Sequence, residues 1–156
     1  MKKHGVLIVL VFALSVLTLV FAGAGPTQAD NQTWCEEAYG ASTGGSLYNT
    51  QVIIGITADA VATKTYDKDE AKNIITEQKA LLDVLGDYAD KLLKQGSSNK
   101  ADLDTLKDIS ACIAKLKVTA DALLAYLANP TDYAVDDFQT KREASYAAIA
   151  KLLGID

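Results

Sequence analysis

The sequence predicts an all-α protein, an antiparallel up-down-up-down four-helix bundle with a short N-terminal helix tied to it by a disulfide. Three observations lead to this prediction. Apolar residues recur at alternating spacings of three and four along three long segments. Residues 51–56 are rich in β-branched side chains, but no other run offers them a partner strand. The connections are short, which makes neighbouring helices antiparallel.

The chain begins with features of a secretory leader. Two lysines at 2–3 precede a charge-free, mostly apolar run at 6–21, and small residues follow. Cleavage is expected after Ala24 or Ala29, and we favour Ala29 because a polar chain starts there. The alternative is an uncleaved anchor, because an apolar run of 16 residues lies between the lengths of typical leaders and of membrane-spanning helices. The assignment of residues 1–29 as a leader predicts a periplasmic or secreted protein, with no membrane insertion beyond this segment.

The charge of the mature chain restricts its partners. Of the 15 basic residues, two lie in the leader, which leaves 13 against 20 acidic residues and a formal charge of −7. Nucleic acids and anionic lipid surfaces select basic patches. The acidic composition therefore opposes nucleic acid and anionic membranes as partners, and it fits either a cationic partner or a role in solubility alone. We expect an unknown protein as the partner.

The mature chain lacks the side chains of familiar catalytic sites. The only histidine, His4, lies in the leader, which excludes serine–histidine and cysteine–histidine nucleophile systems and every imidazole metal site. No glycine-rich phosphate loop is present. The acidic cluster at 67–70 lacks the glycine and the distal glutamate of a calcium loop. We therefore expect no enzymatic activity, no metal and no cofactor.

The segment 30–45 is expected to form a short helix and a glycine-rich loop. Thr33 and Glu36 have the spacing of a capping box, which predicts a helix over 34–39, and Gly40, Gly44 and Gly45 predict a loop. Two cysteines in an exported chain, Cys35 and Cys112, predict one disulfide. Two free thiols or an intermolecular bridge are the alternatives.

The bundle domain is expected to span residues 46–156, with helices at 46–65, 67–95, 100–128 and 132–153. The first has apolar residues on two stripes, one through Ile53 and Ile56 and the other through Leu47 and Ile54. The second and third have continuous heptad-spaced rows. These rows are Ala71, Ile75, Gln78, Leu82, Leu85, Ala89 and Leu92, and Leu106, Ile109, Ile113, Leu116, Ala120, Leu123 and Leu127. The fourth has a weaker row, since it includes Arg142 and Ser145.

Polar residues interrupt these rows at one level of the predicted bundle. Gln78 and Arg142 lie 10 or 11 residues from the starts of two parallel helices, and counting along the other two helices places Gly55, Asp59 and Thr119 near them. One interpretation is a polar layer that fixes helix register, with Asp59 as the partner of Arg142. The second is a pocket beside Gly55 in which Arg142 binds an anion. In the third, Arg142 extends to solvent.

Trp34-Cys35-Glu36-Glu37 after a leader resembles small periplasmic acid-stress chaperones, which also have one disulfide between helical segments. The match covers four residues, and both chain length and cysteine spacing differ, so it implies no functional residues here. We expect a non-enzymatic protein-binding or scaffolding module. The alternatives are a small-ligand binder that uses the layer around Arg142, and a periplasmic stress chaperone or an immunity-type inhibitor.

Overall fold

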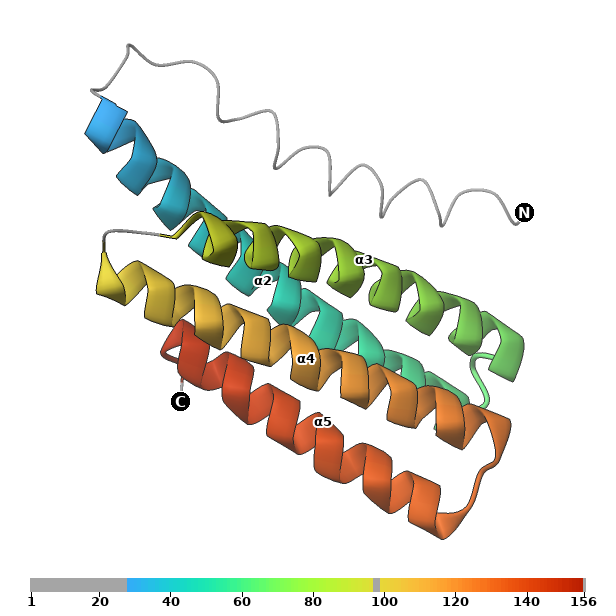
Figure 1. Ribbon diagram of the computed structural model, residues 1–156. Coiled ribbons are helices and arrows are strands. Elements are labelled where there is room, and N and C mark those ends of the chain that lie inside the picture. The colour runs from blue at the N-terminus through green and yellow to red at the C-terminus, as the bar shows by residue number, and fades with distance from the viewer. Residues whose placement is uncertain (1–27, 97–98, 156) are drawn as a thin grey trace. The chain divides into compact units, whose positions relative to one another are not determined.

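In the computed structural model, the chain is described at residues 28–96 and 99–155, with side chains from residue 39 onward. All regular secondary structure in the described part is helical, and that part contains no strand. Its four helices are α2 (Gln28–Ala62), α3 (Lys68–Gln95), α4 (Lys100–Ala128) and α5 (Asp132–Leu153). They pack against one another as a four-helix bundle in which consecutive helices run in opposite directions, as predicted (Figure 1). Nearly all of the expected leader lies outside the described residues.

The chain divides into two compact units, residues 1–34 and 35–156. In the first unit, only residues 28–34 are described, and they are helical. The second unit contains the remainder of α2 and all of α3, α4 and α5.

The ends of α3, α4 and α5 follow local sequence signals. Asp67 caps α3: its carboxylate accepts the backbone N–H groups of Asp69 at 2.9 Å and Glu70 at 2.8 Å, and the Glu70 carboxylate accepts the N–H of Asp67 at 3.2 Å. Asn99 caps α4. Gly154 ends α5 in the left-handed conformation, with φ 64°, which a glycine adopts without a steric penalty. The predicted boundaries of these three helices agree with the structure to within one residue.

The start of the bundle differs from the prediction. The helix continues unbroken through Gly40, Gly44 and Gly45, so the expected short helix and glycine-rich loop at 30–45 are instead part of α2. Gly44 is buried against the end of α5, where an added Cβ would lie 2.7 Å from Leu153 Cδ2. Packing of this kind outweighs the roughly 1 kcal/mol that each glycine costs a helix. Local propensity therefore predicted a loop where tertiary contacts maintain a helix.

The core lies along the predicted rows of α3 and α4 and along part of α5. Side chains that are 0–1% exposed include Leu47 and Ile54 of α2, Ile75 and Leu82 of α3, Ile109, Leu116 and Leu123 of α4, and Ile149 of α5. The stripe predicted through Leu47 and Ile54 lies on the buried face of α2, where these aliphatic residues alternate with Thr43, Thr50 and Thr57, which were not predicted and recur at intervals of seven. The stripe predicted through Ile53 and Ile56 is not a buried face, because Ile56 is 58% exposed.

Ion pairs border the contact between α3 and α4. Lys79 pairs with Asp121, and Lys117 pairs with Asp83 at 2.7 Å. The hydrogen bond from Lys117 lowers the pKa of Asp83. Both pairs are exposed, so they contribute more to the alignment of the two helices than to stability. They also show which flank of α3 borders α4.

Truncation of a central core residue tests this arrangement. Leu116→Ala removes a fully buried side chain from the row of α4, so we expect a loss of about 2–5 kcal/mol in the free energy of unfolding. Val118→Ala, two residues away on the exposed side of the same helix, should change it by less than about 0.5 kcal/mol. Urea denaturation followed by circular dichroism measures both. Equal effects of the two variants would contradict the assigned core.

Candidate functional site

A chain of hydrogen bonds joins three helices midway along the bundle. Thr119 Oγ1 of α4 lies 3.1 Å from Ser145 Oγ of α5, which donates to Gln51 Oε1 of α2 at 2.8 Å. Gln51 Nε2 then donates to the backbone carbonyl of Arg142 at 2.9 Å. Thr119, Ser145 and Gln51 are between 0% and 4% exposed. Because buried polar groups are costly when unbonded, this polar layer specifies which residues of α2, α4 and α5 lie opposite each other.

The guanidinium of Arg142 lies at the edge of this layer. It extends over the backbone of α2 at Gly55, where an added Cβ would lie 2.7 Å from Nη2, and Nη1 is 3.3 Å from the Asp59 carboxylate. The Arg142 side chain is 29% exposed and that of Asp59 is 65% exposed. The pair therefore lies at the rim of the bundle, where such pairs contribute roughly 0–1 kcal/mol. The guanidinium fills the space beside Gly55 that the anion-pocket interpretation required.

The structure brings together most of the residues chosen from the sequence. Asp59, Gly55 and Arg142 are in contact, and Thr119 lies beside them in the polar layer. Gln78 is different: it is 9% exposed, and its Oε1 atom has no hydrogen-bond partner within the described part of the chain. Gln51, the residue that joins α2 to α5, was not among the predicted site residues. The sequence could have indicated Gln51, because this residue lies three positions before Ile54 and therefore on the same buried face of the helix.

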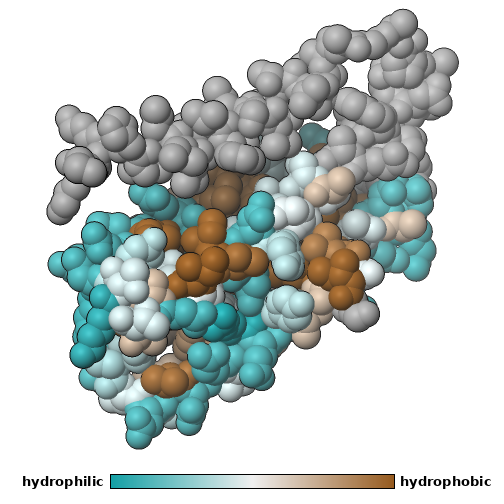
Figure 2. Space-filling model, turned by 180° about the vertical axis from the view of Figure 1, so that it is seen from behind, coloured by the Kyte–Doolittle hydropathy of each residue, from teal (hydrophilic) through white to brown (hydrophobic). Residues whose placement is uncertain are grey.

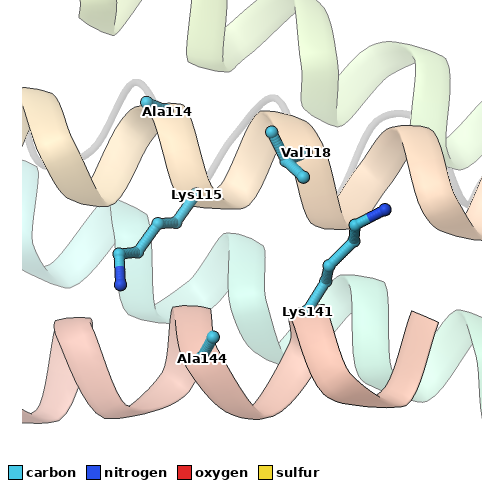
Figure 3. Close-up of a pocket in the computed structure, with 5 residues that line it drawn as sticks. All are labelled: Ala114, Lys115, Val118, Lys141 and Ala144. Atoms are coloured by element: carbon cyan, nitrogen blue, oxygen red, sulfur yellow. The ribbon is translucent and has the colours of Figure 1, made fainter. Parts of the chain in front are cut away.

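A shallow depression of about 260 Å³ lies on the surface between α4 and α5 (Figure 3). Its apolar floor is bordered by Lys115 and Lys141, which come from different helices, and its lining is completed by Ala114, Val118 and Ala144. The Lys141 ammonium is 2.6 Å from the Asp137 carboxylate, so that carboxylate already compensates its charge. The volume lies below the usual range for small-molecule sites, about 300–1,000 Å³, so we do not assign a ligand to it.

Within the described ranges, no group of three or more histidine, cysteine, aspartate or glutamate side chains has the geometry to hold a metal ion. No helix in the described part of the chain is both long and apolar enough to cross a membrane.

Among the residues whose side chains are described, Cys112 is a buried free thiol, so the structure does not support the predicted disulfide. The Cys35 side chain lies outside the described residues, but its place on α2 explains the difference. The polar layer puts Thr119 level with Gln51, so Cys112, seven residues earlier on α4, is level with Gly44. Cys35 lies nine residues beyond that level, a separation of roughly 13 Å along the helix axis. A disulfide requires Cα atoms within about 7 Å, so the continuous α2 separates the two cysteines.

The described surface has one long uncharged helical stretch, residues 38–58 of α2. Three large apolar side chains on it are exposed to solvent at intervals of four residues: Tyr48 at 36%, Val52 at 38% and Ile56 at 58%. This spacing places them on one side of α2, and we call them the α2 stripe. In Figure 1, α2 lies behind α4, and Figure 2, viewed from that side, shows apolar side chains gathered among polar ones.

The helices on either side of α2 also have exposed apolar residues. On α3, Leu81, Val84 and Tyr88 are 40–56% exposed, on the flank turned away from the lysine and aspartate that pair with α4. On α5, Tyr146 is 49% exposed. It lies roughly 200° around the helix from Ala144, which borders α4, and therefore on the flank beside α2.

Comparison with known proteins adds no assignment: no family model, curated protein or solved structure matches this chain.

Two glycines in the middle of helices test the contact between Arg142 and α2. Gly86→Ala meets only ordinary contacts, the nearest 3.5 Å away, and should stabilise the protein by about 1 kcal/mol through helix propensity. Gly55→Ala should lose most of this gain because the new methyl displaces the guanidinium. In an Arg142→Ala background, the two glycine variants should raise the free energy of unfolding by equal amounts. Urea unfolding of this double-mutant cycle measures the difference, and equal gains in the wild-type background would refute the contact.

The state of Cys112 can be tested by alkylation. Burial, followed by the nearby Asp108 carboxylate, raises the pKa of its thiol, so the native protein should react slowly with iodoacetamide at pH 8. In urea without reductant, the peptide containing Cys112 should become fully alkylated, as mass spectrometry can show. If that peptide is protected in urea until a reductant is added, Cys112 is disulfide-bonded and the structural assignment is wrong.

Proposed function

We propose that this chain is an exported, non-enzymatic protein-binding module and that it binds its partner through the α2 stripe. The exposure of Tyr48, Val52 and Ile56 on one uncharged helix supports this proposal most directly. Large contiguous apolar patches are uncommon on monomeric proteins and mark interaction sites. The leader supports export, either to the periplasm or out of the cell.

The chemistry of the surface favours a protein partner. Interface cores are depleted of charged residues and enriched in aromatic ones, and the α2 stripe, with Tyr146 on the flank of α5 beside it, has this composition. The acidic chain and the uncharged helix both oppose nucleic acid and anionic lipid. The ion pair of Arg142 with Asp59 supports a role in positioning α5 against α2 rather than in binding an anion.

A chaperone role would use the same surface in a different way. Exposed apolar side chains also bind unfolded proteins, so the α2 stripe equally supports the stress-chaperone alternative. The two functions differ in what is recognised. A scaffolding module binds one folded partner, whereas a chaperone protects many unfolded ones. Suppression of the aggregation of an unrelated acid-denatured protein would favour the chaperone.

A pair of charge substitutions tests the proposal. Val52→Asp puts a carboxylate in the centre of the α2 stripe, whereas Val118→Asp puts one on the opposite side of the bundle at a similarly exposed valine. With tagged chains expressed with their own leader, we expect wild type and Val118→Asp to retain the same partner from the cell envelope and Val52→Asp to lose it. Calorimetry with the purified partner should show affinity reduced by at least about tenfold. Equal retention by all three chains, or no specific partner of any kind, including another copy of the chain, would refute the proposal.

A further inference from the structure

We infer that the partner of the α2 stripe is a second copy of this chain, bound antiparallel with Val52 on the two-fold axis. This inference rests on the proposed function and specifies its partner. A two-fold interface places the same patch of both chains together, so the patch must complement itself in both shape and charge.

The charge distribution provides the first argument. Two acidic chains repel each other wherever their acidic surfaces meet, and residues 38–58 form a helical surface where no charge opposes contact. Asp59 is the next residue on the same side of α2, and its carboxylate is compensated by Arg142 at 3.3 Å. Two copies can therefore bury this surface without bringing an uncompensated charge to its centre.

The spacing of the residues provides the second argument. Tyr48 and Ile56 lie four residues before and four residues after Val52, so an antiparallel pair centred on Val52 packs the Tyr48 ring of each copy against Ile56 of the other. Seven residues from the axis, Asp59 lies opposite Gly45 of the second copy. A Cβ added at Gly45 would have no atom within 4 Å in one chain, so that position has open space for the approaching side chain. This register thus packs large side chains, Tyr48 and Ile56, against each other near the centre of the interface. At its edge, the register places the Asp59 carboxylate beside the open space at Gly45.

Sedimentation velocity of the chain expressed with its own leader tests this inference. We expect a concentration-dependent dimer for wild type and for Val118→Asp. For Val52→Asp we expect a dissociation constant raised by at least about 100-fold, because two carboxylates would meet on the axis. Added salt should strengthen association, since it screens the like charges elsewhere on the chain. Circular dichroism and urea unfolding show whether the Val52→Asp monomer is folded.

Cysteine pairing tests the antiparallel register without disturbing the axis. In a Cys35→Ser background, a mixture of Tyr48→Cys chains and Ile56→Cys chains should form a disulfide between the two kinds of chain. Chains that all have Tyr48→Cys should form far less. The reverse result would indicate parallel packing and would overturn the inference.

A monomeric wild-type chain at all concentrations, or equal loss of the dimer in Val52→Asp and Val118→Asp, would also overturn it. If a different envelope protein is then captured in a Val52-dependent manner, the proposed function stands and only the second copy is excluded. If neither the dimer nor the capture depends on Val52, both proposals fail.

Discussion

The bundle depends on burial of apolar rows that approach one another from four helices, and the polar layer determines how those rows align. Heptad-spaced leucines and isoleucines can pack in more than one register, because a shift by one turn or one heptad restores a similar apolar contact. The hydrogen bonds among Thr119, Ser145 and Gln51 are satisfied in one register only. A shifted bundle would leave the Gln51 amide buried and unbonded, at a cost of about 1–3 kcal/mol for each polar group of that amide, whereas the hydroxyls of Thr119 and Ser145 would keep their bonds to carbonyls of their own helices.

The same constraint explains the position of Arg142. Its backbone carbonyl accepts the hydrogen bond from Gln51, which holds this part of α5 directly against α2. At that distance a side chain on α2 would collide with the guanidinium, and Gly55 provides the space. The ion pair with Asp59 compensates the charge at the rim. The arginine that first indicated a ligand site thus lies in a close contact between two helices.

α2 differs from the other helices in ways that bear on function. Its inner face includes threonines and a glutamine where α3 and α4 have aliphatic residues, and its outer face has Tyr48, Val52 and Ile56 where a solvent-facing helix normally has charges. A helix that is buried on both sides is expected to have two faces that differ little in polarity. The bundle buries one face of α2, and the proposed dimer would bury the other.

The sequence alone determined the helical class, the limits of α3, α4 and α5, and the rows that form their core. These features follow from capping residues and from a repeat of about 3.5 residues, both of which are local. It also indicated that Arg142, Asp59 and Gly55 would lie at one level, because each residue of a helix adds a constant rise along the bundle axis. The tertiary structure decided the rest. The segment with Gly40, Gly44 and Gly45 is helical because α2 packs along the bundle. Cys35 lies far from Cys112 because that helix is continuous. Ile56 faces outward because the threonines of α2 lie on the buried face. Each of these outcomes depends on contacts between segments distant in the chain, and local propensity and spacing contain no record of those contacts.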